Sequence, residues 1–353
     1  MAYTTIDDPE TYFQTQLYTG NGSANHAITL GGDTDMQPDL VWIKNRDAAD
    51  SHCLFDSVRG ATKVIHSDAT GTETTDTDTL DSFTSDGFQV DADVKVNTNT
   101  EKYVAWCWKA GTTSGINATG ADLSTTGYSF NQTSGFSIIK YTGNLTEDQA
   151  FPHGLGAVPH MVMCRTLANY GWAVYHRGTN GGSDPEDYGM KLETTAAQDN
   201  SDGWWYDTAP TSVLVTVSNG DDNNQTGSNM AYCFTSIQGF SKFGSYTGNG
   251  NTNGTFVYTG FRPSLVIVKI SSGTTGSWCT YSSKVLGYND DNDEFLANDP
   301  GVPGVGNNIS IYSNGFKMLK TTAETNGSGN SFVYMAWAEA PFVNSKGVPC
   351  NAR

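Results

Sequence analysis

Apolar residues in this chain come in short runs whose side chains alternate between two faces. In the run SFVYMAWAEA (331–340), Phe332 and Tyr334 share one face, and Val333 and Met335 share the other. A period of two is typical of a β-strand. Similar runs, rich in Val, Ile, Thr and aromatic residues, are separated by clusters of Gly, Asn, Asp and Ser, and no segment carries a 3.6-residue apolar stripe. The pattern predicts an all-β protein of many short strands.

Four landmarks recur three times in the same order along the chain. Each series begins with YTGN, continues with a proline that leads an apolar run, and passes a short aromatic run (HCLF, WAVY, WCTY). Each series ends on an alanine set among aromatic residues, as in YVAWCWK, MAYCFT and YMAWAEA. The landmark residues are Tyr18, Pro38 and Ala105, then Tyr141, Pro159 and Ala231, then Tyr246, Pro263 and Ala336.

We interpret the landmarks as three tandem, diverged copies of one β-sandwich of roughly 110 residues, with a jelly roll as one form it can take. Each copy is large enough to bury its own core, so we expect separate bodies in tandem. Because no spacer precedes Phe240, the second and third copies are expected to sit rigidly together. The landmark alanines are expected to lie buried in strands under an opposing sheet. The expected boundaries are repeat 1 with an N-terminal arm (1–112), a polar linker or extended arm (113–135), repeat 2 (136–238), repeat 3 (239–345) and a tail (346–353).

The charge of the chain excludes several classes of partner. The formal net charge is −18 with a pI near 4.5, so the phosphates of nucleic acids and anionic membranes should be repelled. No apolar run approaches the roughly 20 residues of a membrane helix, and membrane insertion is not expected. The start, MAYTTIDDPETYF, lacks the basic and apolar regions of a secretory signal, so we expect folding in a cytoplasm.

Six cysteines show neither a CxxC pair nor metal-ligand spacing with histidine. In a chain of this size and expected compartment, disulfides are not expected, and a zinc site is not predicted. Five cysteines lie in apolar or aromatic runs and are expected to be buried and reduced. Cys350 lies in the tail and is the one expected to react with a thiol probe.

Two acidic loops, 219–229 and 288–299, concentrate carboxylates and amides. Carboxylate and amide oxygens are the ligands that calcium prefers, but neither loop has the spacing of a known calcium motif. Calcium is therefore one interpretation of these two loops, and solvated acidic loops are the other; no other cofactor is predicted. The candidate calcium ligands are Asp290, Asp291, Asp293 and Glu294.

The sequence DNSDGWWYD (199–207) places Trp204, Trp205 and Tyr206 between acids and amides. Neighbouring residues of a strand point to opposite faces, so at least one ring is expected to be exposed as a platform for a sugar. The alternative is that these rings cap the core of the second repeat.

The chain shows no catalytic motif. HGLG at His153 has the glycines of an oxyanion loop, but no GxSxG nucleophile elbow accompanies it, and a tight turn before Pro159 is the simpler interpretation. The acids cluster in loops with Asn and Gly, which suits solvated turns, although paired carboxylates for glycoside hydrolysis have no sequence spacing of their own. We do not expect an enzyme.

Several stretches resemble a family of proteins encoded by tailed bacteriophages, many of them marine: DPETYFQTQLYTGNG, FPHGLGAVPHMV, DTAPTSVLVTVSNGD, GFSKFGSYTGNG and YMAWAEAPFVNSKGVP. The resemblance covers nearly the whole chain. It implies a virion component, either a tail-fibre or receptor-binding module or a head decoration, and it brings no catalytic residues. The chain lacks the coiled-coil heptads of a long fibre shaft.

The resemblance and the composition lead to one expected function, that of a phage surface protein of tail-fibre or appendage type that attaches to a host glycan. Its expected location is the virion, after folding in the host cytoplasm and release by lysis. The alternatives are a structural head decoration with no host ligand and a polysaccharide depolymerase. Other virion proteins are the expected partners, and a homo-oligomer, a trimer in particular, would multiply weak contacts.

Overall fold

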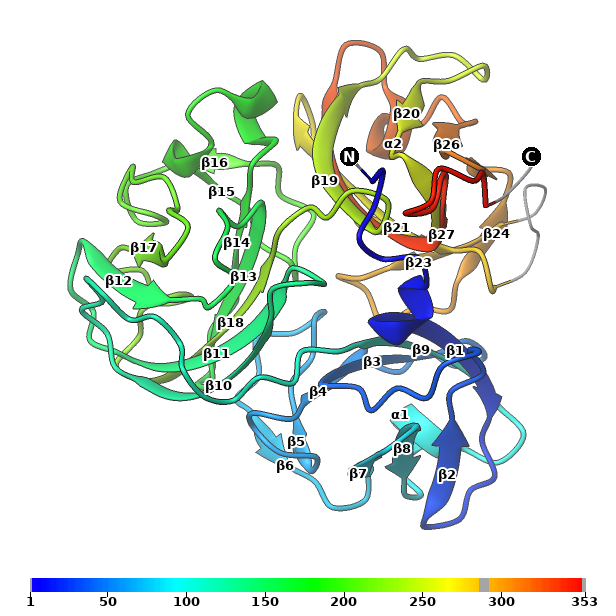
Figure 1. The fold of residues 1–353 in the computed structure, drawn as a ribbon, viewed down its shortest axis with the longest axis horizontal. Helices are drawn as coiled ribbons and strands as arrows, with labels where there is room; N and C mark the ends of the chain where they lie inside the picture. The colour runs from blue at the N-terminus through cyan, green and yellow to red at the C-terminus, as the bar shows by residue number, and fades with distance from the viewer. Residues whose placement is uncertain (1, 286–291, 351–353) are drawn as a thin grey trace.

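Three consecutive stretches of the chain each form a large antiparallel sheet that faces a smaller one. The computed structural model describes residues 2–285 and 292–350. Figure 1 shows the three pairs of sheets as three lobes around a common centre. The prediction of an all-β protein is confirmed, because helix in the described residues is limited to short turns. These turns are η1 (Pro9–Thr11), α1 (Val94–Asn97), η2 (Thr179–Gly182), η3 (Pro185–Asp187) and α2 (Ala323–Asn326).

The first two lobes differ in the number of strands in their sheets. The large sheet of the first lobe consists of β1 (Phe13–Thr19), β9 (Lys102–Trp108), β3 (Leu40–Asn45) and β4 (Cys53–Asp56). Its smaller sheets are β2 (His26–Thr29), β8 (Gly87–Val90) and β7 (Leu80–Thr84), with β5 (Lys63–Val64) and β6 (Thr74–Thr75). The large sheet of the second lobe consists of β10 (Thr125–Asn131), β11 (Phe136–Gly143), β18 (Gly227–Phe234), β13 (Met161–Thr166) and β14 (Trp172–His176). Its smaller sheets pair β12 (Gln149–Pro152) with β17 (Leu214–Val217), and β15 (Tyr188–Gly189) with β16 (Asp199–Asn200).

The third lobe has the longest strands. Its large sheet consists of β19 (Ser241–Thr247), β27 (Ser331–Pro341), β21 (Phe261–Ser272), β22 (Trp278–Ser282), β23 (Asn292–Leu296) and β24 (Gly304–Gly306). Its smaller sheet consists of β20 (Phe256–Tyr258), β26 (Gly315–Met318) and β25 (Ile309–Tyr312).

Four strands of each large sheet follow one order, which is β1-β9-β3-β4, β11-β18-β13-β14 and β19-β27-β21-β22. Their registers also agree. In each large sheet, one residue of the second strand in this order pairs with the first residue of the strand before it. On the strand after it, the same residue pairs with the second residue after the landmark proline. The matched triples are Trp108 with Phe13 and Leu40, Phe234 with Phe136 and Met161, and Trp337 with Ser241 and Leu265. Each landmark proline stands two residues before the last member of its triple. The origin of the lobes by repetition remains an interpretation of this shared order.

The landmark alanines are all buried on the face that packs against the small sheet, as predicted. Ala105 and Ala231 share one register position. Ala336, however, lies two residues farther along its strand, at the position of Cys107 and Cys233 in the other lobes. Aligning Ala336 with the other two alanines is therefore wrong by two residues, and because the strand period is two, this shift leaves it on the same face.

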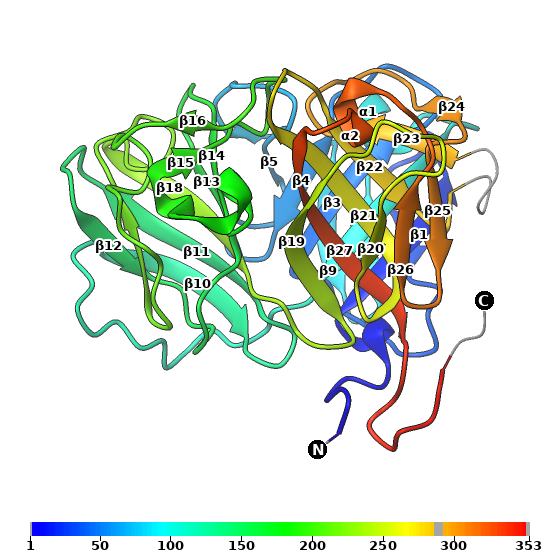
Figure 2. The same cartoon turned by 90° about the horizontal axis from the view of Figure 1, so that it is seen from above.

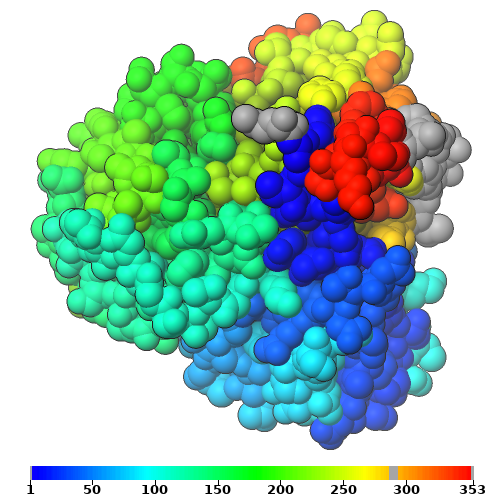
Figure 3. Space-filling view, viewed as in Figure 1, coloured from blue at the N-terminus to red at the C-terminus, as the bar shows by residue number. Residues whose placement is uncertain are grey.

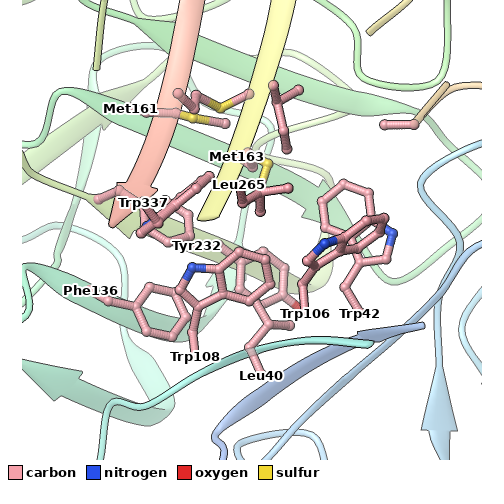
Figure 4. Close-up of a cluster of buried hydrophobic side chains, with 14 of the residues drawn as sticks. Leu40, Trp42, Trp106, Trp108, Phe136, Met161, Met163, Tyr232, Leu265 and Trp337 are labelled. Atoms are coloured by element: carbon pink, nitrogen blue, oxygen red, sulfur yellow. The ribbon is translucent and has the colours of Figure 1, made fainter. Parts of the chain in front are cut away.

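The central strands of each large sheet are buried on both faces, so the expectation of separate bodies in tandem is wrong. One face packs on the small sheet of its own lobe, and the other faces the centre, where the three sheets meet in one apolar cluster (Figure 4). Strands buried on both faces have nearly continuous apolar sequences, as LVWIK and LVIVK do. The cluster includes Trp106 and Trp108 from β9, Tyr232 and Phe234 from β18, and Met335 and Trp337 from β27.

Trp337 lies where all three lobes touch. Its ring is 5.9 Å from that of Phe13 and 5.3 Å from that of Trp108, both in the first lobe. It is 5.5 Å from the ring of Phe234 in the second lobe and 5.5 Å from that of Phe243 in its own lobe. Aromatic pairs at such distances stabilise beyond the area that they bury, so this one side chain couples the three sheets.

A ring of three matched hydrogen bonds also joins the lobes. His52 Nε2 donates to the carbonyl of Leu296, 3.1 Å away, and so links the first lobe to the third. In the same way Trp172 links the second lobe to the first through His66 O (2.9 Å), and Trp278 links the third to the second through Lys191 O (2.9 Å). The donors belong to the HCLF, WAVY and WCTY landmarks. These landmarks therefore close the three lobes into a cycle.

The stretch expected to be a polar linker, 113–135, is part of the second lobe. Its strand β10 pairs antiparallel with the edge strand β11 (Figure 2). Phe130 is buried in the same segment. The prediction of a linker is wrong because β11 leaves an edge that even a polar segment can satisfy with backbone hydrogen bonds.

The two terminal segments lie next to each other on the surface shown in Figure 3. The backbone N–H and the Oγ of Ser345 both donate to the carboxylate of Asp7, at 2.6 Å each. None of the helices in the described part of the chain has the length and apolar character of a membrane span.

All six cysteines are free thiols. Cys53, Cys107, Cys164, Cys233 and Cys279 are buried, and burial raises the pKa of each of these thiols. Cys350 is exposed, as predicted. Its reactivity remains a prediction.

Candidate functional site

The repeated YTGN phrase holds the end of a strand against a buried asparagine. The hydroxyl of Tyr18 donates to the carbonyl of Val96 at 2.8 Å, and the side-chain oxygen of the next residue, Asn97, accepts the N–H of Asn21 at 2.9 Å. The same bonds join Tyr141 to Asn223, Asn144 to Asn224, Tyr246 to Thr325 and Asn249 to Asn326. In each lobe the phrase thus satisfies the side-chain amide of a buried asparagine, Asn97, Asn224 or Asn326, which explains why it recurs.

The glycine of YTGN is required by space. A Cβ on Gly20 would overlap the carbonyl oxygen of Thr98, and a Cβ on Gly143 or Gly248 would overlap the matching carbonyl in its own lobe. The phrase is thus accounted for by folding, and the candidate site lies elsewhere.

The three aromatic residues at 204–206 form a turn and not a strand. Trp205 is buried, with its indole N–H donating to Tyr188 O at 3.1 Å, so its part in a sugar platform is ruled out. Trp204 is half-buried, with its ring directly on the backbone of Gly189. Tyr206 is 38% exposed in a left-handed conformation (φ 53°). Tyr206 is therefore the ring of the three that is exposed, on a turn and not on the face of a strand, and its role as a sugar platform remains a prediction.

The acidic residues proposed for calcium do not converge where the structure describes them. Asp293 pairs with Arg46 at 3.4 Å, whereas Glu294 accepts hydrogen bonds from Tyr281 and from Asn308. Burial raises the pKa of Glu294. Asp290 and Asp291 lie outside the described residues. Within 2–285 and 292–350, no group of three or more His, Cys, Asp or Glu side chains is placed to hold a metal ion.

His153 lies in the connection between β12 and β13, which bends at Gly156. Its ring is buried, Nδ1 accepts the N–H of Leu155 at 3.2 Å, and Nε2 donates to Thr211 O at 3.2 Å. Burial lowers the pKa of His153 to about 4, so the neutral ring acts as a structural bridge.

A groove of about 800 Å³ opens between the two sheets of the third lobe, along β19 and β20. Lys242 lines it from β19, and Phe256 and Tyr258 line it from β20. Arg177 of the second lobe and Tyr3 of the N-terminal segment complete its rim. The hydroxyl of Tyr3 donates to Gly260 O at 2.8 Å, which fixes that segment across one end.

Two aromatic rings in the groove face solvent. Phe256 is 45% exposed and Tyr258 is 47% exposed. Phe256 is held edge-on by Tyr312, with centroids 5.9 Å apart, and Lys242 Nζ lies 5.2 Å from the ring of Tyr258. Exposed rings held by neighbours have the geometry that ligand stacking requires.

The groove also concentrates positive charge in an acidic protein. Among the described residues, neither Lys242 nor Arg177 forms an ion pair with a carboxylate. Lys242 Nζ donates to Tyr258 O at 2.7 Å, and Arg177 lies 2.9 Å from a ring nitrogen of His160. Burial, together with the charge of Arg177, lowers the pKa of Lys242. The site therefore favours an anionic ligand.

The outer edge of β19 has free backbone groups. The N–H of Ala338 in β27 donates to Phe240 O, and the N–H of Gly248 donates to Asn330 O, just before β27. The even-numbered residues of β19 between Phe240 and Gly248 therefore turn toward β27. Phe243 and Ser245 therefore turn outward. The N–H of Phe243 binds the hydroxyl of Ser236 at 3.1 Å, but in the described structure the carbonyl of Phe243 and both backbone groups of Ser245 have no partner.

Sequence reasoning missed this groove. The signal that could have indicated it is a difference between lobes at two matched positions. The first lobe has Gln14 and Gln16 there, and the third has Lys242 and Gly244. A change from two amides to a cation and a glycine marks a difference in function only when the registers are known.

Comparison with known proteins identifies the family of the chain and nothing closer. No curated protein and no solved structure matches it significantly. The matching family model begins at Asp8, which caps η1, and ends at Pro341, the last residue of β27, so it spans all three lobes. The chain thus belongs to the family described as a domain of unknown function, DUF7483, over residues 8–341.

Proposed function

We propose that the protein is a non-enzymatic binding protein on the surface of a tailed-bacteriophage particle, of the tail-fibre or appendage type, with a role in host attachment. The observation that carries this proposal is the β19–β20 groove, where exposed rings and cations without ion pairs lie together on a tightly joined body. The resemblance to phage proteins supports the location.

The chemistry of the groove suits binding. Its described lining residues include no Asp, Glu, His or Cys, which are the groups that general acid–base or nucleophilic catalysis employs most. Depolymerase activity by paired carboxylates would need two acids across a bound sugar. The lining residues supply stacking, charge and backbone hydrogen bonds instead.

A head-decoration protein is the second candidate, and the cycle of hydrogen bonds between the lobes favours it. The His52, Trp172 and Trp278 bonds make one closed body, which suits a part that reinforces a shell. A homo-trimer, other virion proteins as partners and a host glycan as ligand remain predictions.

The proposal is tested on intact particles and on cells. Antibody labelling should place the protein on purified phage, and purified protein should compete with the phage for adsorption. Tyr258→Ala should abolish competition, whereas Tyr206→Ala, which removes an exposed ring in another lobe, should leave it unchanged. Absence of the protein from purified particles would refute the proposal, and labelling of the head without competition would favour the decoration protein.

A further inference from the structure

In all three lobes a gap separates the edge of the large sheet from the edge of the small sheet, and different groups occupy this gap in each lobe. In the second lobe the chain's own arm fills it. The N–H groups of Asp122 and Leu123 donate to Ala150 O at 2.9 and 3.0 Å, which joins the arm to β12. The arm then continues as β10, which pairs with β11. One extended segment thus bonds to the edges of both sheets.

In the first lobe two glutamine side chains close the same gap. The side-chain oxygen of Gln16 accepts the N–H of Gly31 at 2.9 Å, and that of Gln14 accepts the N–H of Gly32 at 3.0 Å. The amide of Gln16 also donates to Leu17 O at 2.8 Å, a carbonyl on the outer edge of β1. This edge is therefore capped by its own side chains.

In the third lobe the matched positions close the gap only in part. Lys242 stands at the position of Gln14, and its Nζ donates to Tyr258 O of β20 at 2.7 Å. Gly244 stands at the position of Gln16 and has no side chain to reach across. The backbone groups that β10 satisfies on β11 correspond here to those of Phe243 and Ser245. The N–H of Phe243 binds the Ser236 hydroxyl, whereas the carbonyl of Phe243 and both groups of Ser245 have no partner in the described structure.

We propose that this groove accepts an extended, acidic segment of a partner polypeptide, which adds a strand antiparallel to the outer edge of β19. The inference rests on the proposed function of the groove as a binding site. Its geometry is that of β10 on β11, where an added strand gains its affinity from main-chain hydrogen bonds. Lys242 and Arg177 supply the complementary charge.

The free backbone groups favour a strand over a sugar. An added strand would supply the donor for Phe243 O and both partners for Ser245, with the spacing of an antiparallel ladder. An exposed edge is also a surface that proteins usually protect, as the first two lobes do here. A sugar would use the rings of Phe256 and Tyr258 and would leave this ladder unmade.

The test measures peptide binding by titration calorimetry with the full chain. The probe is the peptide of residues 121–131, ADLSTTGYSFN, carrying Ser124→Asp and Thr126→Asp to add negative charge. Its matched control is N-methylated at the positions of Gly127 and Ser129, whose partners Lys140 and Ile138 present the outer edge of β11. The probe should bind, and the N-methylated peptide should not.

Two pairs of protein variants locate the binding. Ser245→Pro removes an edge N–H that the ladder with β27 does not use, and it should weaken probe binding roughly tenfold or more, while Ser245→Ala changes it less than about twofold. Lys242→Glu should weaken binding to a similar extent, whereas Lys140→Glu, the same charge change on the second lobe, should not. Unchanged unfolding midpoints show that the variants are folded.

Three results would overturn the inference. They are no binding of the probe, equal binding of the N-methylated peptide, and full binding by Ser245→Pro, which would place the peptide in the second lobe in place of the arm. An oligogalacturonate that binds with sensitivity to Lys242→Glu but not to Ser245→Pro, when the peptide fails, would identify an acidic sugar as the ligand. If labelling still finds the protein on particles, only this inference fails and the proposed function stands.

Discussion

The central cluster and the three outer cores are built from opposite faces of the same strands. In β27, Trp337 points to the centre, and its neighbour Ala336 points to the small sheet of the third lobe. The centre collects the tryptophans of all three large sheets, whereas the same strands present alanines, cysteines and valines, together with phenylalanine and tyrosine rings, to the outer cores. The comparison shows that a lobe is not an independent folding unit, because the largest side chains of each sheet are buried only by the other two.

The largest expected effect is at the centre. Trp337→Ala should lower the free energy of unfolding by about 3–5 kcal/mol, as removal of a large buried side chain does, and should do so for the whole chain at once, since the ring touches all three lobes. Denaturant unfolding followed by fluorescence and by far-UV circular dichroism should give one coincident transition. Separate transitions for the lobes would show that the central cluster does not couple them.

Removal of one tyrosine hydroxyl compares the centre with an outer core and disturbs the packing less than Trp337→Ala does. Tyr232 OH donates to the buried carboxylate of Asp56 at 2.6 Å, across the first and second lobes. Tyr232→Phe should cost about 1.5–3 kcal/mol, because the bond is to a charged group. Tyr18→Phe, which removes a bond to the neutral carbonyl of Val96 within one lobe, should cost about 0.5–1.5 kcal/mol.

Chemical denaturation of both variants under one set of conditions measures the two losses of unfolding free energy. Equal losses would contradict the expectation that Tyr232→Phe costs more than Tyr18→Phe.

Overpacking tests the outer core of the third lobe. Ala336 is fully buried under the small sheet, so Ala336→Phe should cost on the order of 1–3 kcal/mol. Hydrogen exchange should show the loss of protection concentrated in β20, β25 and β26. An unchanged melting transition would mean that the space under this sheet is larger than the structure indicates.

The smallest effect concerns pH and the bond between the first and third lobes. Burial lowers the pKa of His52 to about 3, below the value of about 6.5 for an unfolded chain. The unfolded state therefore binds an extra proton between these values, and stability is full above pH 6.5 and is lost as the pH falls. His52 alone contributes a slope of up to about 1.4 kcal/mol per pH unit. His52→Gln should remove this contribution, and identical slopes for the two proteins near pH 5 would contradict it.

Two sequence patterns were sufficient for the local structure. A period of two predicted strands, and the recurrence of YTGN and of the landmark prolines marked positions that do share one register. These features depend on interactions within one lobe, such as the tyrosine hydroxyl of YTGN and the carbonyl before its buried asparagine. Burial of five cysteines followed from their apolar neighbours in the same way.

Tertiary structure alone decided how the lobes join and where a ligand can bind. Alternation distinguishes the two faces of a strand, but it does not say that both are buried, because the rings of Trp106 and Trp337 are covered by sheets distant in sequence. Nor does a polar composition reveal that 125–131 completes a sheet, since backbone hydrogen bonds are available to almost any residue. The groove beside β19 depends on the absence of a side chain at Gly244, and that absence has meaning only against the filled edges of the other two lobes.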